Sequence, residues 1–197
     1  MTGETVSNAA LDVLFRKGRS YAAFTDEPVT VAQLQAIYEL AKFGPSTANS
    51  QPQRILFLLS AQAKQRLVPA LSSINREKTL AAPAVAIFAY DLKFYENLPR
   101  LYWNQAATSW YTRTPEHTEQ TAFRNATLQA AWFMMAVRAL GFDCGPMSGF
   151  DNAKVDAEFF PEGRLKSNFL CLIGKGDASK LPQPNPRLEF GEVCSVL

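Results

Sequence analysis

The sequence is poor in histidine and lacks several motifs that mark common active sites. His117 is the one histidine among 197 residues, and we interpret it as a surface or hydrogen-bonding residue. This interpretation excludes multi-histidine metal sites and histidine-based catalytic triads, so no metal is expected. GxGxxG, GxxxxGK(S/T), HExxH and GxSxG are all absent, and no pair of acidic residues has a defensible catalytic spacing. If the chain is an enzyme, we expect a cofactor to carry the difficult chemistry.

Paired cysteines, long apolar runs and a strong net charge are also missing. Cys144, Cys171 and Cys194 are odd in number and form no CxxC pair, which favours a reduced, cytoplasmic protein. No apolar run reaches membrane-spanning length, and the first residues include no basic signal region. The net charge of +2 indicates neither nucleic acid nor a membrane surface as the main partner. Any anion site must therefore be local, built from a few Lys and Arg residues.

The length and composition suit a single domain, 1–197, whose helices and strands alternate without a regular βαβ rhythm. This order predicts an α+β fold rather than a doubly wound sheet. Residues 118–140 should form a long helix that is apolar nearly all round, so that the sheet or another subunit covers both faces. Residues 91–119 should be irregular. The other expected helices are 7–17, 31–43 and 61–71, interrupted at Pro69, with one more after Asp151; the expected strands are 54–60, 84–90 and 168–174.

The segment GPSTANSQPQ, residues 44–53, is longer than the two to six residues, roughly, of an ordinary helix-to-strand connection. Its residues are small, polar or conformationally fixed by proline. We call it the 44–53 loop. Four further segments stand out: Arg19-Ser20 after a helix end, Asn75-x-x-Lys78 before the second strand, Gly145-Pro146-Met147-Ser148-Gly149 after the long helix, and Arg187 in the tail. Each has an ordinary structural explanation if taken alone.

In this order, the segments resemble the nitroreductase family of flavin-dependent oxidoreductases over essentially the whole chain. The strings RSYAAF, GPSTANSQP, PALSSINREKTLAAP, TAFRN, GPMSGFD, LKSN and PRLEF look most like the malonic semialdehyde reductase branch, associated with pyrimidine degradation. The resemblance implies a central, mostly antiparallel sheet flanked by helices, and an interleaved homodimer with FMN at its interface. Two positions depart from the family pattern: Ala22 or Ala23 replaces a second basic residue, and Gln53 replaces a tryptophan.

The resemblance also implies a role for each segment. Arg19 and Ser20 would hold the ribityl chain and phosphate, with Arg187 also on the phosphate. Asn75 and Lys78 would lie at the pyrimidine edge of the flavin, with Lys78 as the electrostatic catalytic group on the N1 side. Ser148 would present its backbone near N5. The remaining cofactor-binding residues would be Pro146, Met147 and Gly149 from the same subunit, and Pro45, Ser46, Thr47 and Asn49 from the partner.

The function implied is hydride transfer from NADH or NADPH through FMN to a small acceptor, in ping-pong order. The acceptor would be malonic semialdehyde, reduced to 3-hydroxypropionate, or a related carbonyl compound; the alternative is a broad nitroaromatic or quinone reductase. An alternative of another class is a flavin-binding protein without turnover, and a third is a structural dimer that has lost FMN. Trp103, Trp110, Tyr111 and Arg113 would form a lid that shapes the acceptor site, although a solvated Arg113 is favoured over a substrate contact.

Overall fold

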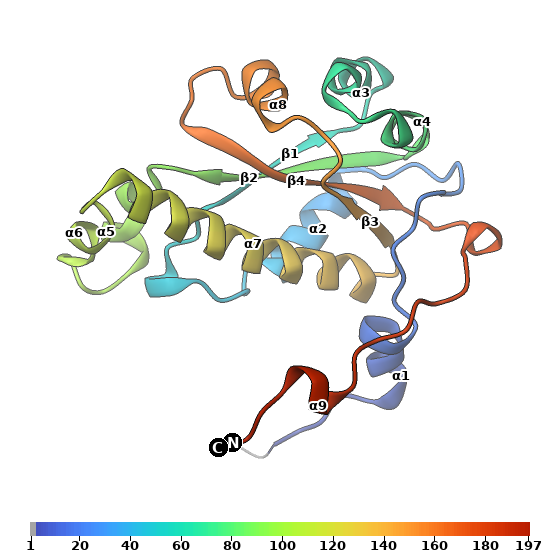
Figure 1. The fold of residues 1–197 in the computed structure, drawn as a ribbon, viewed down its shortest axis with the longest axis horizontal. Coiled ribbons are helices and arrows are strands. Elements are labelled where there is room, and N and C mark those ends of the chain that lie inside the picture. The colour runs from blue at the N-terminus through green and yellow to red at the C-terminus, as the bar shows by residue number, and fades with distance from the viewer. Residues whose placement is uncertain (1–2) are drawn as a thin grey trace.

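A four-stranded antiparallel sheet forms the centre of the computed structural model, which describes residues 3–197 (Figure 1). The strand order is β1-β2-β4-β3, and every neighbouring pair is antiparallel. The strands are β1 (Gln53–Leu58), β2 (Ala84–Asp91), β3 (Asp143–Met147) and β4 (Leu165–Gly174). The predicted α+β class and the antiparallel sheet are confirmed.

β2 lies between the two halves of the hydrophobic core, and all of its residues are buried. Ala86 and Phe88 belong to the apolar cluster on one face of the sheet, and Val85 and Ile87 belong to the cluster on the other. Burial of a large apolar side chain contributes about 1.5–3 kcal/mol, so both faces require a covering layer of helices. The continuous apolar run in the sequence is therefore explained by a central strand with two buried faces.

α2 (Val31–Ala41) and α7 (Pro115–Ala139) cover one face of the sheet (Figure 1). Thr30 begins α2 in a capping box with Gln33, and the predicted cap is confirmed. α7 begins before the predicted residue 118, because the side chain of Thr114 accepts the N–H of His117 and a proline occupies the first helical position.

The predicted cover on both faces of α7 is found on one face only. Ala130, Phe133 and other inward residues are fully buried against the sheet. On the outer face, Phe123, Leu128 and Trp132 are 47%, 44% and 45% exposed. Phe123 also contacts the ring of Tyr90 on β2, at a centroid distance of 5.7 Å. A single chain therefore leaves an apolar surface on its longest helix.

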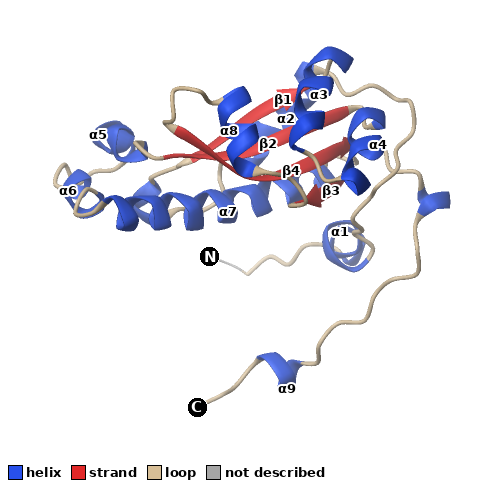
Figure 2. Ribbon diagram, turned by 45° about the horizontal axis from the view of Figure 1, so that its top comes forward, coloured by secondary structure: helices blue, strands red, loops and turns tan. Residues whose placement is uncertain are grey.

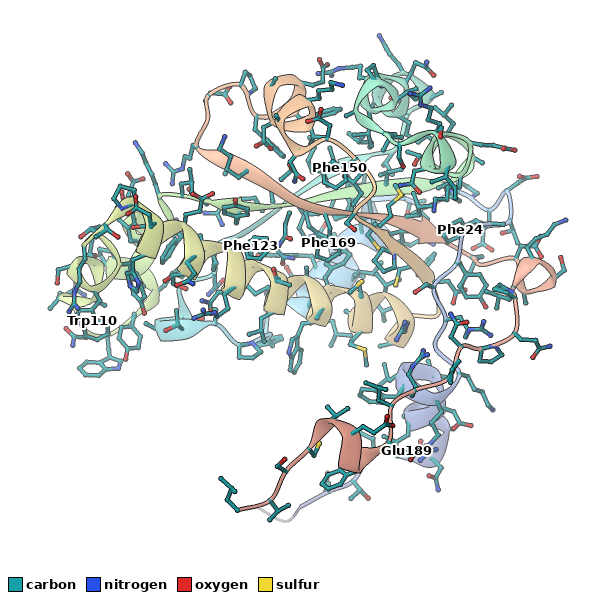
Figure 3. All side chains as sticks on the ribbon, viewed as in Figure 1. Phe24, Trp110, Phe123, Phe150, Phe169 and Glu189 are labelled. Carbon is teal, nitrogen blue, oxygen red and sulfur yellow. The ribbon has the colours of Figure 1, made fainter. Side chains whose placement is uncertain are left out.

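Three helices cover the opposite face of the sheet: α3 (Ala61–Leu67), α4 (Ser73–Ala81) and α8 (Asn152–Phe159) (Figure 1). α3 ends in the 3₁₀ turn η3 (Val68–Ala70), which contains the proline expected to interrupt this helix. Asp151 caps α8 by accepting the N–H of Lys154, as predicted. Phe150, just before this cap, packs between the sheet and these helices (Figure 3).

The segment 91–119 is more regular than expected. It forms η4 (Phe94–Asn97), α5 (Leu98–Leu101) and α6 (Ala107–Tyr111), and α7 begins within it. Phe94 and Tyr111 of this segment form a small apolar cluster with Tyr90 of β2 and with residues of α7. Short helices with little sequence periodicity are stabilised by this packing rather than by local propensity, which explains why the sequence did not reveal them.

The two ends of the chain lie beside the sheet rather than in it. The predicted first helix is α1 (Asn8–Leu11) continued by the π-helical turn η1 (Asp12–Arg16). After β4, the chain passes η5 (Ala178–Lys180), extends away from the sheet and ends with α9 (Phe190–Val193) (Figure 2). Within residues 3–197, no helix has both the length and the apolar character needed to cross a bilayer.

Candidate functional site

The 44–53 loop has an unusual backbone. Ala48, Asn49 and Gln51 have φ angles of 46°, 50° and 44°, in the left-handed region. For a residue with a side chain this conformation costs about 1–2 kcal/mol. Such residues persist where surrounding contacts enforce them, and they gather at functional sites.

Hydrogen bonds to three helices hold the 44–53 loop in place. The backbone N–H of Thr47 donates to Asn125 Oδ1 of α7 at 2.8 Å, and its hydroxyl lies 3.0 Å from the Tyr111 hydroxyl of α6. Asn49 Nδ2 donates to the carbonyl of Leu101, at the end of α5, at 3.0 Å. The loop is therefore fixed before any ligand binds.

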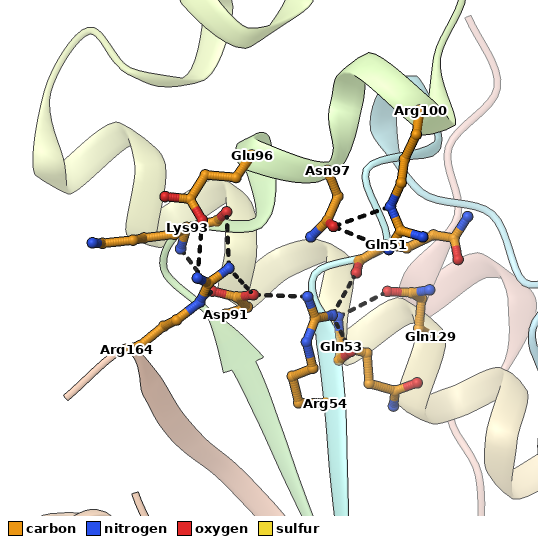
Figure 4. Close-up of polar contacts among 10 residues, drawn as sticks. All are labelled: Gln51, Gln53, Arg54, Asp91, Lys93, Glu96, Asn97, Arg100, Gln129 and Arg164. Carbon is orange, nitrogen blue, oxygen red and sulfur yellow. Dashed lines mark hydrogen bonds and ion pairs between the residues drawn. The ribbon is translucent and has the colours of Figure 1, made fainter. Parts of the chain in front are cut away.

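A buried carboxylate supports the far end of the loop (Figure 4). Asp91 is 1% exposed and accepts from Arg54 Nη2 at 2.7 Å and from Arg164 Nε at 2.8 Å. Arg54 Nη1 in turn donates to the carbonyls of Gln51 at 3.0 Å and Gln53 at 2.7 Å. The Asp91 carboxylate also raises the pKa of Arg164, which remains a cation. This network connects the left-handed loop to the middle of the sheet.

A pocket of about 210 Å³ brings together the predicted residues Arg19, Ser20 and Arg187. Arg138 lines it as well, and no carboxylate does. We call it the arginine pocket. Arg19 Nη2 donates to the Pro182 carbonyl at 2.6 Å, and Arg187 Nη1 donates to backbone carbonyls of its own segment. Within residues 3–197 no ion pair involves these three arginines, so the pocket carries uncompensated positive charge suited to an anion.

The structure also joins Asn75 with Gly149, from segments more than 70 positions apart. Asn75 is buried on α4, and its Nδ2 donates to the Gly149 carbonyl at 2.8 Å. A Cβ on Gly149 would lie 2.5 Å from Asn75 Nδ2, so glycine is required for this close approach. Lys78 is half-buried one turn further along α4, and no hydrogen bond or ion pair of the described residues uses its ammonium group.

Two backbone donors face outward beside this contact. Ser148 and Gly149 are exposed, and in the described part of the chain neither of their N–H groups donates a hydrogen bond. Pro146 is exposed and Met147 half-buried at the end of β3. Free N–H groups at an exposed turn can bind an acceptor atom of a ligand without displacing any protein partner.

Strand β3 connects the arginine pocket with the Asn75–Gly149 contact. Ser20 forms a β-bridge with Cys144, in β3, and the N–H of Tyr21 donates to the Cys144 carbonyl at 3.0 Å. Gly149 lies five residues further along, roughly 16 Å in an extended chain. No hydrogen bond of residues 3–197 joins the 44–53 loop to either group, and the pockets lined by Arg19 and by Ser148 include none of its residues. Pro45, Ser46, Thr47 and Asn49 thus lie apart from the other predicted residues of the same chain.

Two residues of this arrangement, Arg138 and Asn125, escaped the sequence analysis, and a third, Tyr111, was given another role. Arg138 resembles an ordinary cation in the last turn of a helix, where the helix dipole favours positive charge. Asn125 lies inside a mostly apolar helix. Tyr111, predicted as a lid residue, has a buried ring, and its hydroxyl lies 3.0 Å from the Thr47 hydroxyl. A polar residue on the buried face of the long helix was the one signal available for Asn125.

The remaining aromatic candidates differ in exposure. Trp103 is 81% exposed, while Trp110 packs against Tyr102 near α6 at the end of the molecule (Figure 3). His117 stacks on the ring of Tyr111 at a centroid distance of 6.4 Å, in keeping with a structural role. Residues 3–197 contain no cluster of three or more His, Cys, Asp or Glu side chains able to hold a metal.

Two thiols are buried on neighbouring strands of the sheet. Cys144 and Cys171 are both buried, on the neighbouring strands β3 and β4. Contact with the Cys144 thiol, together with burial, raises the pKa of Cys171 well above its ordinary value. The Cys171 thiol is therefore protonated at neutral pH and is not a nucleophile.

Comparison with known proteins identifies the family. The nitroreductase family model matches residues 16–174. The fold is similar to ydfN of Bacillus subtilis, named as a nitroreductase (TM-score 0.86, 23% identity, 97% of this chain and 100% of that one). It is also similar to an Exiguobacterium sibiricum protein named as a nitroreductase, in complex with FMN (TM-score 0.86, 21% identity, all of both chains). A third match is a Staphylococcus epidermidis protein named as an NAD(P)H:FMN oxidoreductase (TM-score 0.83, 21% identity, all of both chains). The chain belongs to the nitroreductase family.

Proposed function

We propose that the protein is an FMN-dependent oxidoreductase that accepts reducing equivalents from NADH or NADPH and passes them to a small acceptor. The observation that carries this proposal is the arginine pocket, beside one end of β3, together with the free backbone donors Ser148 and Gly149 just after the other end. Membership of the nitroreductase family and the names of the similar Exiguobacterium and Staphylococcus proteins support it.

The described residues fit FMN in four respects. The arginine pocket offers guanidinium groups without a competing carboxylate, which suits a phosphate. The N–H groups of Ser148 and Gly149 are free, and Gly149 lets the main chain approach a planar ring closely. Among residues 3–197, no carboxylate pairs with the ammonium group of Lys78 on α4. The extended length of β3 between these features suits an elongated molecule with a phosphate at one end and a ring at the other.

Each residue then has a physical task. Arg19, Ser20 and Arg187 bind the phosphate and the adjoining chain. Asn75 and Lys78 hold the pyrimidine edge, where the Lys78 charge favours negative charge on the ring. FMN, when bound, supplies the two-electron hydride chemistry, which agrees with the lack of a histidine-based catalytic group in the chain.

We also propose a homodimer in which the partner's 44–53 loop completes the site. The exposed Phe123, Leu128 and Trp132 line an apolar groove of about 670 Å³ on α7 that a second copy would cover. The separation of the 44–53 loop from the other predicted site residues of its own chain supports its action in trans. Leu128→Lys places a charge in this groove and should shift the protein from dimer to monomer in sedimentation analysis, whereas the exposed Lys180→Ala should not.

Mixed dimers test the trans arrangement directly. Asn49→Ala and Arg19→Ala should each weaken FMN binding, since one removes a loop contact and the other a phosphate contact. If the two residues serve one site from different chains, mixed dimers recover one intact site each. If they served the same chain, mixing would restore nothing.

For the acceptor, we propose malonic semialdehyde or a related short carbonyl compound, from the resemblance of the sequence segments to that branch. Trp103 and Trp110 would shape the acceptor site, and the exposed Arg113 would be the candidate for a substrate carboxylate. An acceptor screen on the anaerobically reduced protein compares carbonyl acids, nitroaromatic compounds and quinones. Fast turnover with nitroaromatics or quinones alone would favour the broad reductase instead.

The flavin proposal is tested by colour. Purified protein should be yellow, and its flavin absorbance should bleach when NADH or NADPH is added without oxygen. Yellow protein that resists reduction would indicate a binding protein without turnover. Colourless protein that takes up no FMN would refute both the enzyme and the binding protein.

Lys78→Ala should slow flavin reduction roughly tenfold to hundredfold while FMN stays bound. This effect is smaller than that of removing an enclosed oxyanion donor, because Lys78 is half-buried. Lys180→Ala is the control.

A further inference from the structure

The arginine pocket contains a guanidinium group with an unsatisfied donor. Arg138 belongs to the last turn of α7, and its Nη1 donates to the Leu14 carbonyl at 3.0 Å. Its Nε is buried and has no hydrogen-bond partner within residues 3–197. Nearly all buried polar groups in proteins have a hydrogen-bond partner. The buried Nε of Arg138 is therefore expected to donate to an acceptor atom of a bound ligand.

Close packing fixes the guanidinium group of Arg138 at the pocket wall. A Cβ on Gly18 would lie 2.7 Å from Arg138 Nη1 and 2.8 Å from Cζ. The group therefore rests against the backbone of Gly18, in the space that any larger residue would fill. Because Gly18 directly precedes Arg19 and Ser20, the same packing places Arg138 beside both predicted phosphate ligands.

The charges around Arg138 favour an anion. Arg19 and Arg187 line the same pocket, and all three guanidinium groups donate to backbone carbonyls rather than to carboxylates. Asp143, at the start of β3, does not line the pocket and accepts the N–H of Gly176 at 2.9 Å. The C-terminal dipole of α7 offers only a partial negative charge of about one half. One dianionic group would balance most of the remaining positive charge.

We propose that Arg138 is a third guanidinium ligand of the FMN phosphate, beside Arg19 and Arg187. This assignment rests on the proposed flavin function. Arg138 binds the phosphate and takes no part in hydride transfer. Its ordinary alternative is a structural clamp that ties α7 to Leu14 and satisfies the helix dipole.

The two roles are separated by comparing FMN with riboflavin, which has the same ring and ribityl chain but no phosphate. Apo-protein is titrated with each flavin, and the ratio of the riboflavin Kd to the FMN Kd measures the phosphate contribution. Charged hydrogen bonds are individually strong, so Arg138→Met should lower this ratio about tenfold to hundredfold, with the riboflavin Kd nearly unchanged. Arg66→Met, which removes an exposed arginine paired with Glu158, should leave the ratio as in the wild type.

If Arg138→Met does not fold, Arg138→Gln replaces it. The glutamine amide removes the positive charge but still offers a hydrogen-bond donor for the Leu14 carbonyl. The same drop in ratio is expected. Equal weakening of FMN and riboflavin, or an unchanged ratio in the folded variant, would overturn the assignment and leave the flavin function intact. A wild-type protein that binds neither flavin would overturn the proposed function, and this assignment with it.

Discussion

Asp91→Asn removes the negative charge from the most enclosed ion-pair network of the described residues while keeping the size of the side chain. The carboxylate is 1% exposed and accepts from Arg54, from Arg164 and from the N–H of Lys93, at 2.7–2.9 Å. The amide can accept with one oxygen only, and it directs its NH₂ group toward a guanidinium donor. Arg54 of β1 and Arg164, which directly precedes β4, then lose the counter-ion that they share at the end of β2.

The expected loss in the free energy of unfolding depends on how exposed the two arginine partners of Asp91 are. Breaking a fully buried pair costs about 3–5 kcal/mol. Arg54 and Arg164 are 34% and 41% exposed, so water can partly solvate them after the change. We therefore expect the free energy of unfolding to fall by about 2–3 kcal/mol. For a chain of this size that corresponds to a fall in Tm of roughly 4–12 °C.

Urea unfolding of Asp91→Asn and wild type, at one protein concentration, measures this loss. Asp26→Asn is the matched control, because Asp26 is exposed and has no ion pair among the described residues. Since Arg54 also donates to the Gln51 carbonyl, FMN affinity should fall as the 44–53 loop loosens. A free energy of unfolding within 0.5 kcal/mol of the control, about the spread of ordinary surface substitutions, would refute the reasoning.

Three other outcomes are expected. Gly149→Ala should weaken flavin binding at least tenfold, because the new Cβ would lie 2.5 Å from Asn75 Nδ2; unchanged affinity in a fluorescence titration would contradict this. A thiol reagent should label about one cysteine per native chain, the exposed Cys194, and all three after unfolding, since the other two are buried. The N–H of Lys154 lowers the pKa of Asp151, so this group stabilises the fold above its unfolded pKa of about 4. That contribution is lost as pH falls through the lower folded value, and Asp151→Ala should weaken the dependence of Tm on pH between about 5 and 3.

Much of the fold was predictable because its main signals are local. The capping residues Thr30 and Asp151 are side chains that bond to the next turn of the same segment, and the buried strands appear as apolar runs. The strand at Cys144 was less visible because Gly145 and Pro146 weaken its pattern. Gly145 is required there by the carbonyl of Tyr21, which would lie 1.9 Å from a Cβ. Such contacts depend on residues far away in the sequence.

The sequence identified several residues of the candidate site, but it could not show which of them contact one another. The order of short motifs pointed to Arg19, Asn75 and Arg187, and the structure brings Arg19 and Arg187 into one pocket. Arg138 was not predictable, because its environment depends on how α7 packs against the first helical segment. Which chain supplies the 44–53 loop stays a prediction, since it depends on a second copy.

The left-handed backbone of the 44–53 loop has opposite consequences for the stability of the fold and for the rigidity of the loop. Glycine in place of Ala48 would relieve conformational strain of about 1 kcal/mol, so selection for heat resistance would favour it. The same glycine would let the loop sample many shapes, and selection for tight binding would reject it. An alanine at φ 46° therefore fits a loop whose rigidity matters more than its contribution to the stability of the fold.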